Sequence, residues 1–232
     1  MPIRLRLRLL ARAASLGALA PMVAGCLAAG SGAAAVRLPP PAYDPPTRGV
    51  QTAVLSGGCF WGVQGVFEHV KGVRKVWAGY DGGSTASANY EAVSTGTTGN
   101  AESVELEFDP AVISYGEILR IYFSLATDPT QVNQQFPDRG PQYRGEIFYR
   151  TPLQKAVAQR YMAQLAAARV FSRPIATRLD PDRNFVRAES WHQDYLVRHP
   201  TQPYIAIYDM PKLANLRSLF PGYWRAQPVL AL

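Results

Sequence analysis

The chain has few of the residues that build cross-links or metal centres, since its 232 residues include only two cysteines and three histidines. Two cysteines cannot supply a disulfide framework, so the fold must rely on a hydrophobic core. No Asp, Glu or His grouping has metal-ligand spacing, and no glycine-rich, phosphate-cradling motif is present. The sequence therefore indicates no metal or nucleotide site and calls for no cofactor.

Charge of one sign is not in large excess either. The formal net charge is +7, and four of the arginines lie in the first 25 residues, which leaves +3 for the remainder. This is too mild to indicate nucleic-acid binding. A hydrophobic content of 47% predicts a folded body with a buried core.

A long apolar run is also missing, because the apolar stretch from Ala13 to Gly25 is short and contains Pro21. It follows a basic start, so residues 1–25 are predicted to be an export signal. Val23-Ala24-Gly25 before Cys26 resembles the lipobox of bacterial lipoproteins, in which that cysteine is acylated. The expected location is the bacterial cell envelope, facing the periplasm and anchored by lipid. An ordinary cleaved signal with an incidental cysteine is the alternative.

Residues 26–49 are rich in Pro, Ala and Gly, including Pro39-Pro40-Pro41 and Pro45-Pro46. This composition predicts a tether between the anchor and a domain that spans residues 50–232.

Within that domain, hydrophobic patterning predicts strands over 51–55, 73–78, 102–108 and 145–149, and helices over 59–70 and 114–125. The order is β-α-β-β-α-β, which is the split β-α-β (ferredoxin-like) pattern of an α+β fold: a two-layer mixed sheet with helices on one side. Further elements are predicted in a helix opened by Thr151-Pro152, a strand near 175–179, and short helices near 185–196 and 212–220. Two long loops, 79–100 and 127–144, interrupt the domain, which is typical of functional segments.

Cys59 follows Gly57-Gly58 and is predicted to lie on the first turn of a helix. Unpaired backbone N–H groups there favour a thiolate, so we expect a lowered pKa for Cys59. The neighbouring glycines are expected to leave the sulfur open to approach, and Phe60-Trp61 to form an apolar wall. A buried, inert cysteine is the alternative.

The segment Gly58-Cys59-Phe60-Trp61-Gly62 resembles the signature of the peptide methionine sulfoxide reductase A family. Further motifs follow in the order found in that family, so that the resemblance covers roughly residues 54–220. They are Gly79-Tyr80 with Gly82-Gly83, Asn89-Tyr90-Glu91, residues 95–102, Asp128-Pro129-Thr130-Gln131, and residues 138–144.

The resemblance implies reduction of methionine sulfoxide, as the S epimer at sulfur, in oxidised proteins and peptides. It makes Cys59 the nucleophile and Glu102 the acid, with Tyr90 and Tyr143 as hydrogen-bond donors to the sulfoxide oxygen. Phe60 and Trp61 would cradle the S-methyl group, and Asp138 would orient the substrate or a water. Read without the family, Glu102 is a solvated strand-end carboxylate, the tyrosines pack at the edge of the core, and Asp138 caps a turn.

The chain departs from the family pattern in two places. Asn100 stands where many members have histidine, and no cysteine follows Cys59 to resolve its sulfenic acid. Unless an unlipidated Cys26 returns to the site, an external reductant, a thioredoxin-like protein or a small thiol, has to regenerate Cys59. The alternatives are a non-catalytic peptide-binding lipoprotein and a thiol hydrolase that pairs Cys59 with His192 or His199, which look like surface residues.

Overall fold

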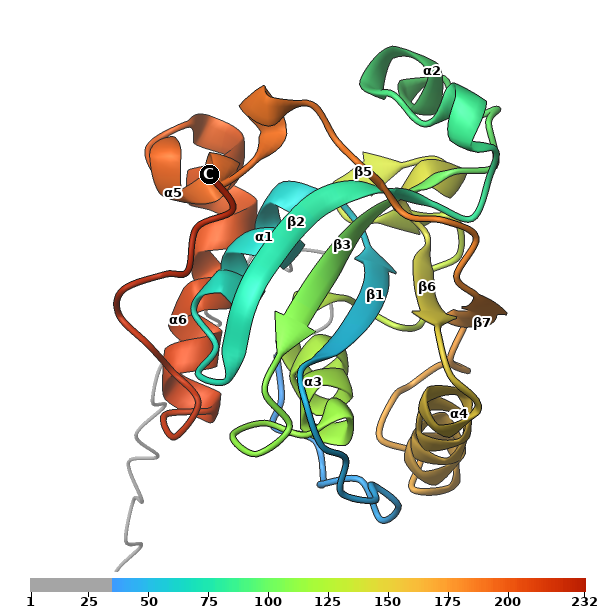
Figure 1. Ribbon diagram of the computed structural model, residues 1–232, viewed down its shortest axis with the longest axis vertical. Coiled ribbons are helices and arrows are strands. Elements are labelled where there is room, and N and C mark those ends of the chain that lie inside the picture. The colour runs from blue at the N-terminus through green and yellow to red at the C-terminus, as the bar shows by residue number, and fades with distance from the viewer. Residues whose placement is uncertain (1–34) are drawn as a thin grey trace, which may run out of the picture. The chain divides into compact units, whose positions relative to one another are not determined.

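A six-stranded sheet lies at the centre of the part of the chain that the structure, a computed structural model, describes, residues 35–232 (Figure 1). Its central strands lie in the order β6-β1-β3-β2, and each neighbouring pair is antiparallel. They span Gln51–Gly57 (β1), Val73–Asp81 (β2), Ala101–Phe108 (β3) and Gly145–Tyr149 (β6). The edges are β7 (Arg178–Pro181), parallel to β6, and β8 (Val186–Arg187), antiparallel to β2. The predicted α+β fold with its split core is confirmed.

Strand β3 shows how the sequence pattern sets the two faces of the sheet. Val104, Leu106 and Phe108 are fully buried in the hydrophobic core, whereas Glu105 and Glu107 between them are only half-buried. This period of two is the one that places alternate side chains on opposite faces of a strand. The apolar face packs against the helices, which Figure 1 shows behind the sheet at α1 and α6.

Four helices carry most of the remaining core: α1 (Phe60–Glu68), α3 (Tyr115–Ile121), α4 (Pro152–Ala167) and α6 (Met210–Leu219). The Ser114 hydroxyl accepts from the backbone N–H of Glu117, and Thr151 accepts from that of Gln154. These are N-cap bonds, and Pro152 occupies the first turn of α4, where its missing N–H costs nothing.

Several element boundaries differ from the predicted ones. The helix predicted to end at residue 125 changes to a π-helix over Tyr122–Ala126, and the strand predicted near 175–179 begins only at Arg178. The helix predicted over 185–196 is β8, a 3₁₀ turn (Ser190–His192) and α5 (Tyr195–Arg198), because Asp194 between them has a left-handed φ of 56°.

The two long loops contain short ordered elements. The first holds a 3₁₀ turn (Thr85–Ser87) and α2 (Tyr90–Ser94). The second holds β4 (Gln134–Gln135), β5 (Asp138–Arg139) and a 3₁₀ turn (Pro141–Tyr143).

Residues 36–44, which we call the strap, are not a free tether. The Leu38 side chain is 2% exposed, and the prolines that follow it offer carbonyl groups to the helices. Arg120 Nε donates to Leu38 O (2.7 Å), Tyr161 Oη to Pro39 O (2.8 Å) and Gln164 Nε2 to Pro40 O (2.9 Å). Proline lacks a backbone donor but keeps its acceptor, so a proline run can dock through carbonyls alone. The predicted tether is therefore wrong for these residues.

The export signal, Cys26 and the rest of the predicted tether up to residue 34 lie outside the described residues. Among residues 35–232, no helix combines the length and apolar character that a membrane span requires.

Candidate active site

Cys59 lies at the junction between β1 and α1. It is the N-cap residue of α1, one position before the predicted first turn. Gly58 before it has a left-handed φ of +97°, and a Cβ there would lie 2.7 Å from the Gln135 side chain. Glycine is required at this point because another loop closes over it. Cys59 is consequently only 8% exposed, and the expectation that the glycines leave the sulfur open is wrong.

Burial controls the chemistry of the Cys59 thiol in the resting protein. Desolvation raises its pKa well above the usual value, and the nearby carboxyl groups of Glu102, Asp209 and Asp138 raise it further. The backbone N–H of Trp61 opposes this rise but is outweighed. The predicted lowering of the pKa is therefore wrong, because the N–H groups at the start of α1 compete with loss of water and three acidic neighbours.

Glu102 is the second residue of β3 and is 4% exposed. Its Oε2 accepts from the backbone N–H of Phe60 (3.0 Å), which places the carboxyl beside the residue after Cys59. Burial raises the pKa of Glu102 to about 8, helped by Asp138 and Asp209 and opposed by the bond from Phe60. At neutral pH this carboxyl is mostly protonated, as a proton donor has to be.

Asp138 and Tyr143 come from the second long loop. The Asp138 carboxylate accepts from the Tyr204 hydroxyl. Burial raises the pKa of Tyr143, and the charges of Glu102, Asp138 and Cys59 raise it further. These groups are therefore electrostatic neighbours of the Tyr143 hydroxyl. Tyr143 closes a 3₁₀ turn whose first carbonyl, that of Pro141, is held by Arg144 Nη1 (2.9 Å). The loop thus brings a carboxylate and a phenol to the same place as Cys59 and Glu102.

Aromatic rings form a wall beside these groups. Trp61 stacks on Tyr195 with ring centroids 3.9 Å apart, and its Nε1 donates to Nδ1 of His192 (3.0 Å). Phe60 is 1% exposed beneath the wall, in edge contact with His192. Tyr90, at the start of α2, is 39% exposed, and its ring centroid is 4.6 Å from that of His192. Trp61 and Tyr90 therefore face the accessible side, whereas Phe60 supports them from behind.

The family model for peptide methionine sulfoxide reductase matches residues 51–221. The chain belongs to this family. It is 52% identical to peptide methionine sulfoxide reductase MsrA 2 of Mesorhizobium japonicum, over 79% of this chain and 94% of that protein. It is 49% identical to MsrA 2 of Synechocystis, over 78% of this chain and 84% of that protein.

Solved structures of the family share the fold. Reduced Mxr1 of Saccharomyces cerevisiae superposes with a TM-score of 0.60 at 27% identity, over 66% of this chain and 87% of that one. Methionine sulfoxide reductase A of Corynebacterium diphtheriae gives 0.57 at 31% identity, over 67% and 78%. The strap precedes the region that the peptide methionine sulfoxide reductase model matches.

In this reductase the structure groups Cys59, Glu102, Tyr143 and Asp138, with Trp61 and Tyr90 at the aromatic wall. Sequence reasoning missed the residues that arrive from the C-terminal third, Tyr204 and Asp209, which no local motif connects to Cys59. It also took His192 for a surface residue, although this side chain is fully buried. The sequence signal for the burial of His192 was the presence of an aromatic residue on each side of it, Trp191 and Tyr195.

Asn100 stands where many family members have histidine. Its side chain binds the first long loop and does not tune the pKa of Glu102. Its side-chain oxygen accepts from the Gly83 N–H (3.1 Å) and its nitrogen donates to the Ser84 carbonyl (3.0 Å). The amide therefore ties the start of β3 to the first long loop, which leads to Tyr90.

Proposed function

We propose that the chain is a peptide-methionine (S)-S-oxide reductase in which Cys59 is the nucleophile and Glu102 the proton donor. One observation carries this proposal: a carboxyl with a pKa of about 8 is bonded to the backbone N–H of Phe60, directly beside a buried cysteine. Family membership supports it, since the relatives at 52% and 49% identity are peptide methionine sulfoxide reductases by name.

The first half-reaction balances within the site. The Cys59 sulfur attacks the electron-poor sulfoxide sulfur, while the Glu102 proton passes to the sulfoxide oxygen and the thiol proton replaces it on the carboxyl. The S–O bond of the substrate and the transient S–S bond then break as the hydroxyl moves to the Cys59 sulfur, so that methionine leaves with two more electrons on its sulfur and Cys59 is left as a sulfenic acid. Because the resting sulfur is a thiol, this proton transfer belongs to the reaction rather than preceding it.

The other groups divide between the oxygen and the methyl group of the substrate. The Tyr143 hydroxyl, a neighbour of Glu102 and Cys59, and the Tyr90 hydroxyl at the rim donate to the sulfoxide oxygen. The Trp61 ring, braced by Tyr195 and backed by Phe60, receives the methyl group, which gains about 1 to 2 kcal/mol from burial. Asp138, fixed by Tyr204, orients the substrate.

Regeneration requires an external thiol. Cys59 is the only cysteine among residues 35–232, so no partner thiol is available in that part of the chain. One thiol forms a mixed disulfide with Cys59 and releases water, and a second thiol frees Cys59 and leaves as the disulfide. A thioredoxin-like dithiol or a small thiol can serve.

The test is incubation of the purified chain with a peptide containing S-sulfoxide and a dithiol, followed by mass spectrometry for loss of one oxygen. Cys59→Ser should abolish the loss, whereas the matched variant Cys26→Ser should retain it. Oxygen loss that survives Cys59→Ser, or none from the unchanged protein, would contradict the proposal. Peptide binding without oxygen loss would instead indicate the non-catalytic alternative.

The thiol hydrolase has little support in the site. His192 accepts from Trp61 at Nδ1, and the carboxylate oxygen near its Nε2 belongs to Glu189, at 3.8 Å. Burial lowers the pKa of His192 to about 4, so the ring is neutral and serves the aromatic wall.

We also propose that Cys26 is acylated and holds the reductase at the bacterial cell envelope, facing the periplasm. The support is the sequence alone: a basic start, a short apolar stretch and Val-Ala-Gly before Cys26. The expected result is that the protein partitions with membranes and carries a lipid mass increment on Cys26, both lost in Cys26→Ser. An unmodified soluble protein that begins at another residue would contradict it.

A further inference from the structure

A buried ion pair lies behind the first turn of α1. The Asp209 side chain, at the end of the π-helix Ile205–Asp209, is fully buried, and its Oδ1 accepts from Lys212 Nζ (3.0 Å). Its Oδ2 has no hydrogen-bond partner among the described residues. A Cβ on Gly62 would overlap the Asp209 carboxylate and lie 2.9 Å from Lys212 Nζ. The pair therefore occupies the space that Gly62 leaves bare, three residues after Cys59.

The charge of Asp209 acts on the groups of the proposed reaction. It raises the pKa of Cys59, of Glu102 on β3, of Asp138 on β5 and of Tyr204. Burial raises the pKa of Asp209 itself, and Lys212 opposes that rise. Lys212 also lowers the pKa of Asp138.

We propose that Asp209 and Lys212 are positioning residues for Cys59: a charge pair, seated against Gly62, that controls how readily the thiol gives up its proton. The proposal rests on Cys59 being the nucleophile. With the pair intact, the Lys212 ammonium offsets only part of the Asp209 charge, and removal of either partner changes the net charge behind Cys59. Loss of the carboxylate leaves a cation that favours the thiolate, and loss of the ammonium leaves, above the pKa of Asp209, an unpaired anion that disfavours it.

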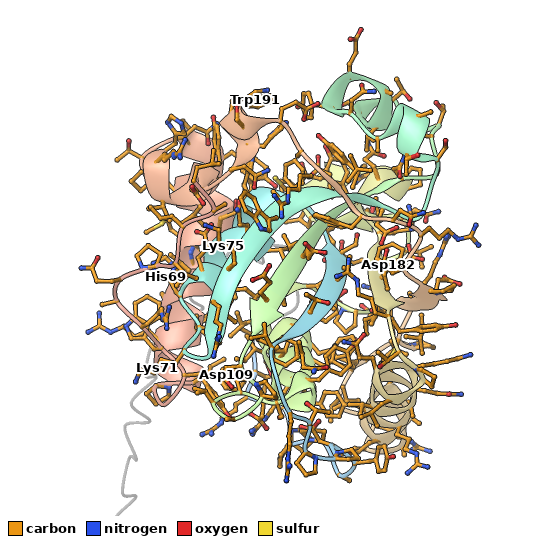
Figure 2. All side chains as sticks on the ribbon, viewed as in Figure 1. His69, Lys71, Lys75, Asp109, Asp182 and Trp191 are labelled. Atoms are coloured by element: carbon orange, nitrogen blue, oxygen red, sulfur yellow. The ribbon has the colours of Figure 1, made fainter. Side chains whose placement is uncertain are left out.

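The test measures alkylation of Cys59 by iodoacetamide in the full chain from pH 6 to 10, with the peptide that contains Cys59 quantified by mass spectrometry. Asp209→Asn should accelerate alkylation at pH 7 by about tenfold, which is the change in thiolate fraction when a neighbouring charge moves the pKa of the thiol by about one. Lys212→Met should slow it at pH values where Asp209 is ionised, and the double variant should fall between the two. The matched control is Asp109→Asn, which also breaks a pair with a cation, Arg74. Asp109 lies far from Trp191, whose ring packs against that of His192 in the aromatic wall (Figure 2), and the alkylation profile of Asp109→Asn should equal that of the unchanged protein.

Opposite signs for the two single variants separate charge control from mere loosening, because a loosened site would accelerate alkylation in both. Equal acceleration in both, or no acceleration in Asp209→Asn with an unchanged melting temperature, would overturn the proposal. Should Asp209→Asn fail to fold, Lys212→Met decides alone, since its side chain is 24% exposed, and acceleration there refutes the idea. Alkylation needs no sulfoxide. The alkylation test can therefore fail while the reductase activity is confirmed, and the reductase activity can fail while the alkylation test succeeds.

Discussion

Leu38 in the strap offers a direct test of whether residues before the family region belong to the folded domain. Its side chain is 2% exposed within the main core cluster, so Leu38→Ala removes a fully buried side chain and leaves a cavity. Substitutions of this kind cost about 2 to 5 kcal/mol. For a domain of this size about 3 kcal/mol corresponds to a fall of about 9 °C in melting temperature.

The assay is thermal and urea unfolding of the full chain, with Val36→Ala as the matched control. Val36 is 48% exposed in the same segment, so its truncation should change the unfolding free energy by less than about 0.5 kcal/mol. If Leu38→Ala and Val36→Ala unfold alike, the strap contributes no core packing and the reasoning from its burial and carbonyl bonds fails.

Four further predictions concern the site. Glu102→Gln should slow single-turnover reduction by about a hundredfold or more in rapid-quench measurements, because an amide cannot deliver the proton. The raised pKa of Glu102 gives stability that is full below its unfolded-state pKa and is lost as the pH rises through about 8. Urea unfolding should therefore show the unchanged protein losing stability relative to Glu102→Gln between pH 5 and 9, and parallel curves would contradict this. Gly58→Ala should destabilise the fold by about 2 kcal/mol, because φ is +97° and Gln135 lies against the added methyl, and a neutral effect would show that the loop yields. Without reductant, the chain should release one methionine per protein and leave a dimedone-reactive Cys59, and a burst without dimedone labelling would exclude the sulfenic acid.

The sequence predicted the elements that local patterning decides. The alternation in β3 and the Thr151-Pro152 helix start are properties of a few neighbouring residues, and both were found where expected. Cys59 and Glu102 could be brought together in advance only through the family motifs. Composition misjudged the strap, since a proline run looks like a linker until side chains such as Arg120 and Tyr161 are seen to bond its carbonyls.

The protonation state of Cys59 could not be derived in the same way. The local argument, a thiol at a helix start after two glycines, was sound as far as it went. The opposing contributions come from burial beneath Gln135 and from the carboxyl groups of Glu102, Asp138 and Asp209. All of these residues lie 43 or more positions along the chain from Cys59. A pKa depends on the whole enclosure, and a sequence window does not contain it.

The buried, protonated thiol has a consequence for the survival of Cys59 under oxidising conditions. Peroxides and electrophiles react with thiolates, and access and thiolate fraction together set how fast a cysteine is lost to irreversible oxidation. Cys59, which is 8% exposed and has a raised pKa, is therefore poorly reactive toward both, and in the proposed reaction this changes only when a substrate brings the oxygen that takes the proton of Glu102. In the proposed reaction this enclosure confers chemoselectivity, because Cys59 becomes nucleophilic only toward the bound sulfoxide. Such protection matters where, as among residues 35–232, no second cysteine is present.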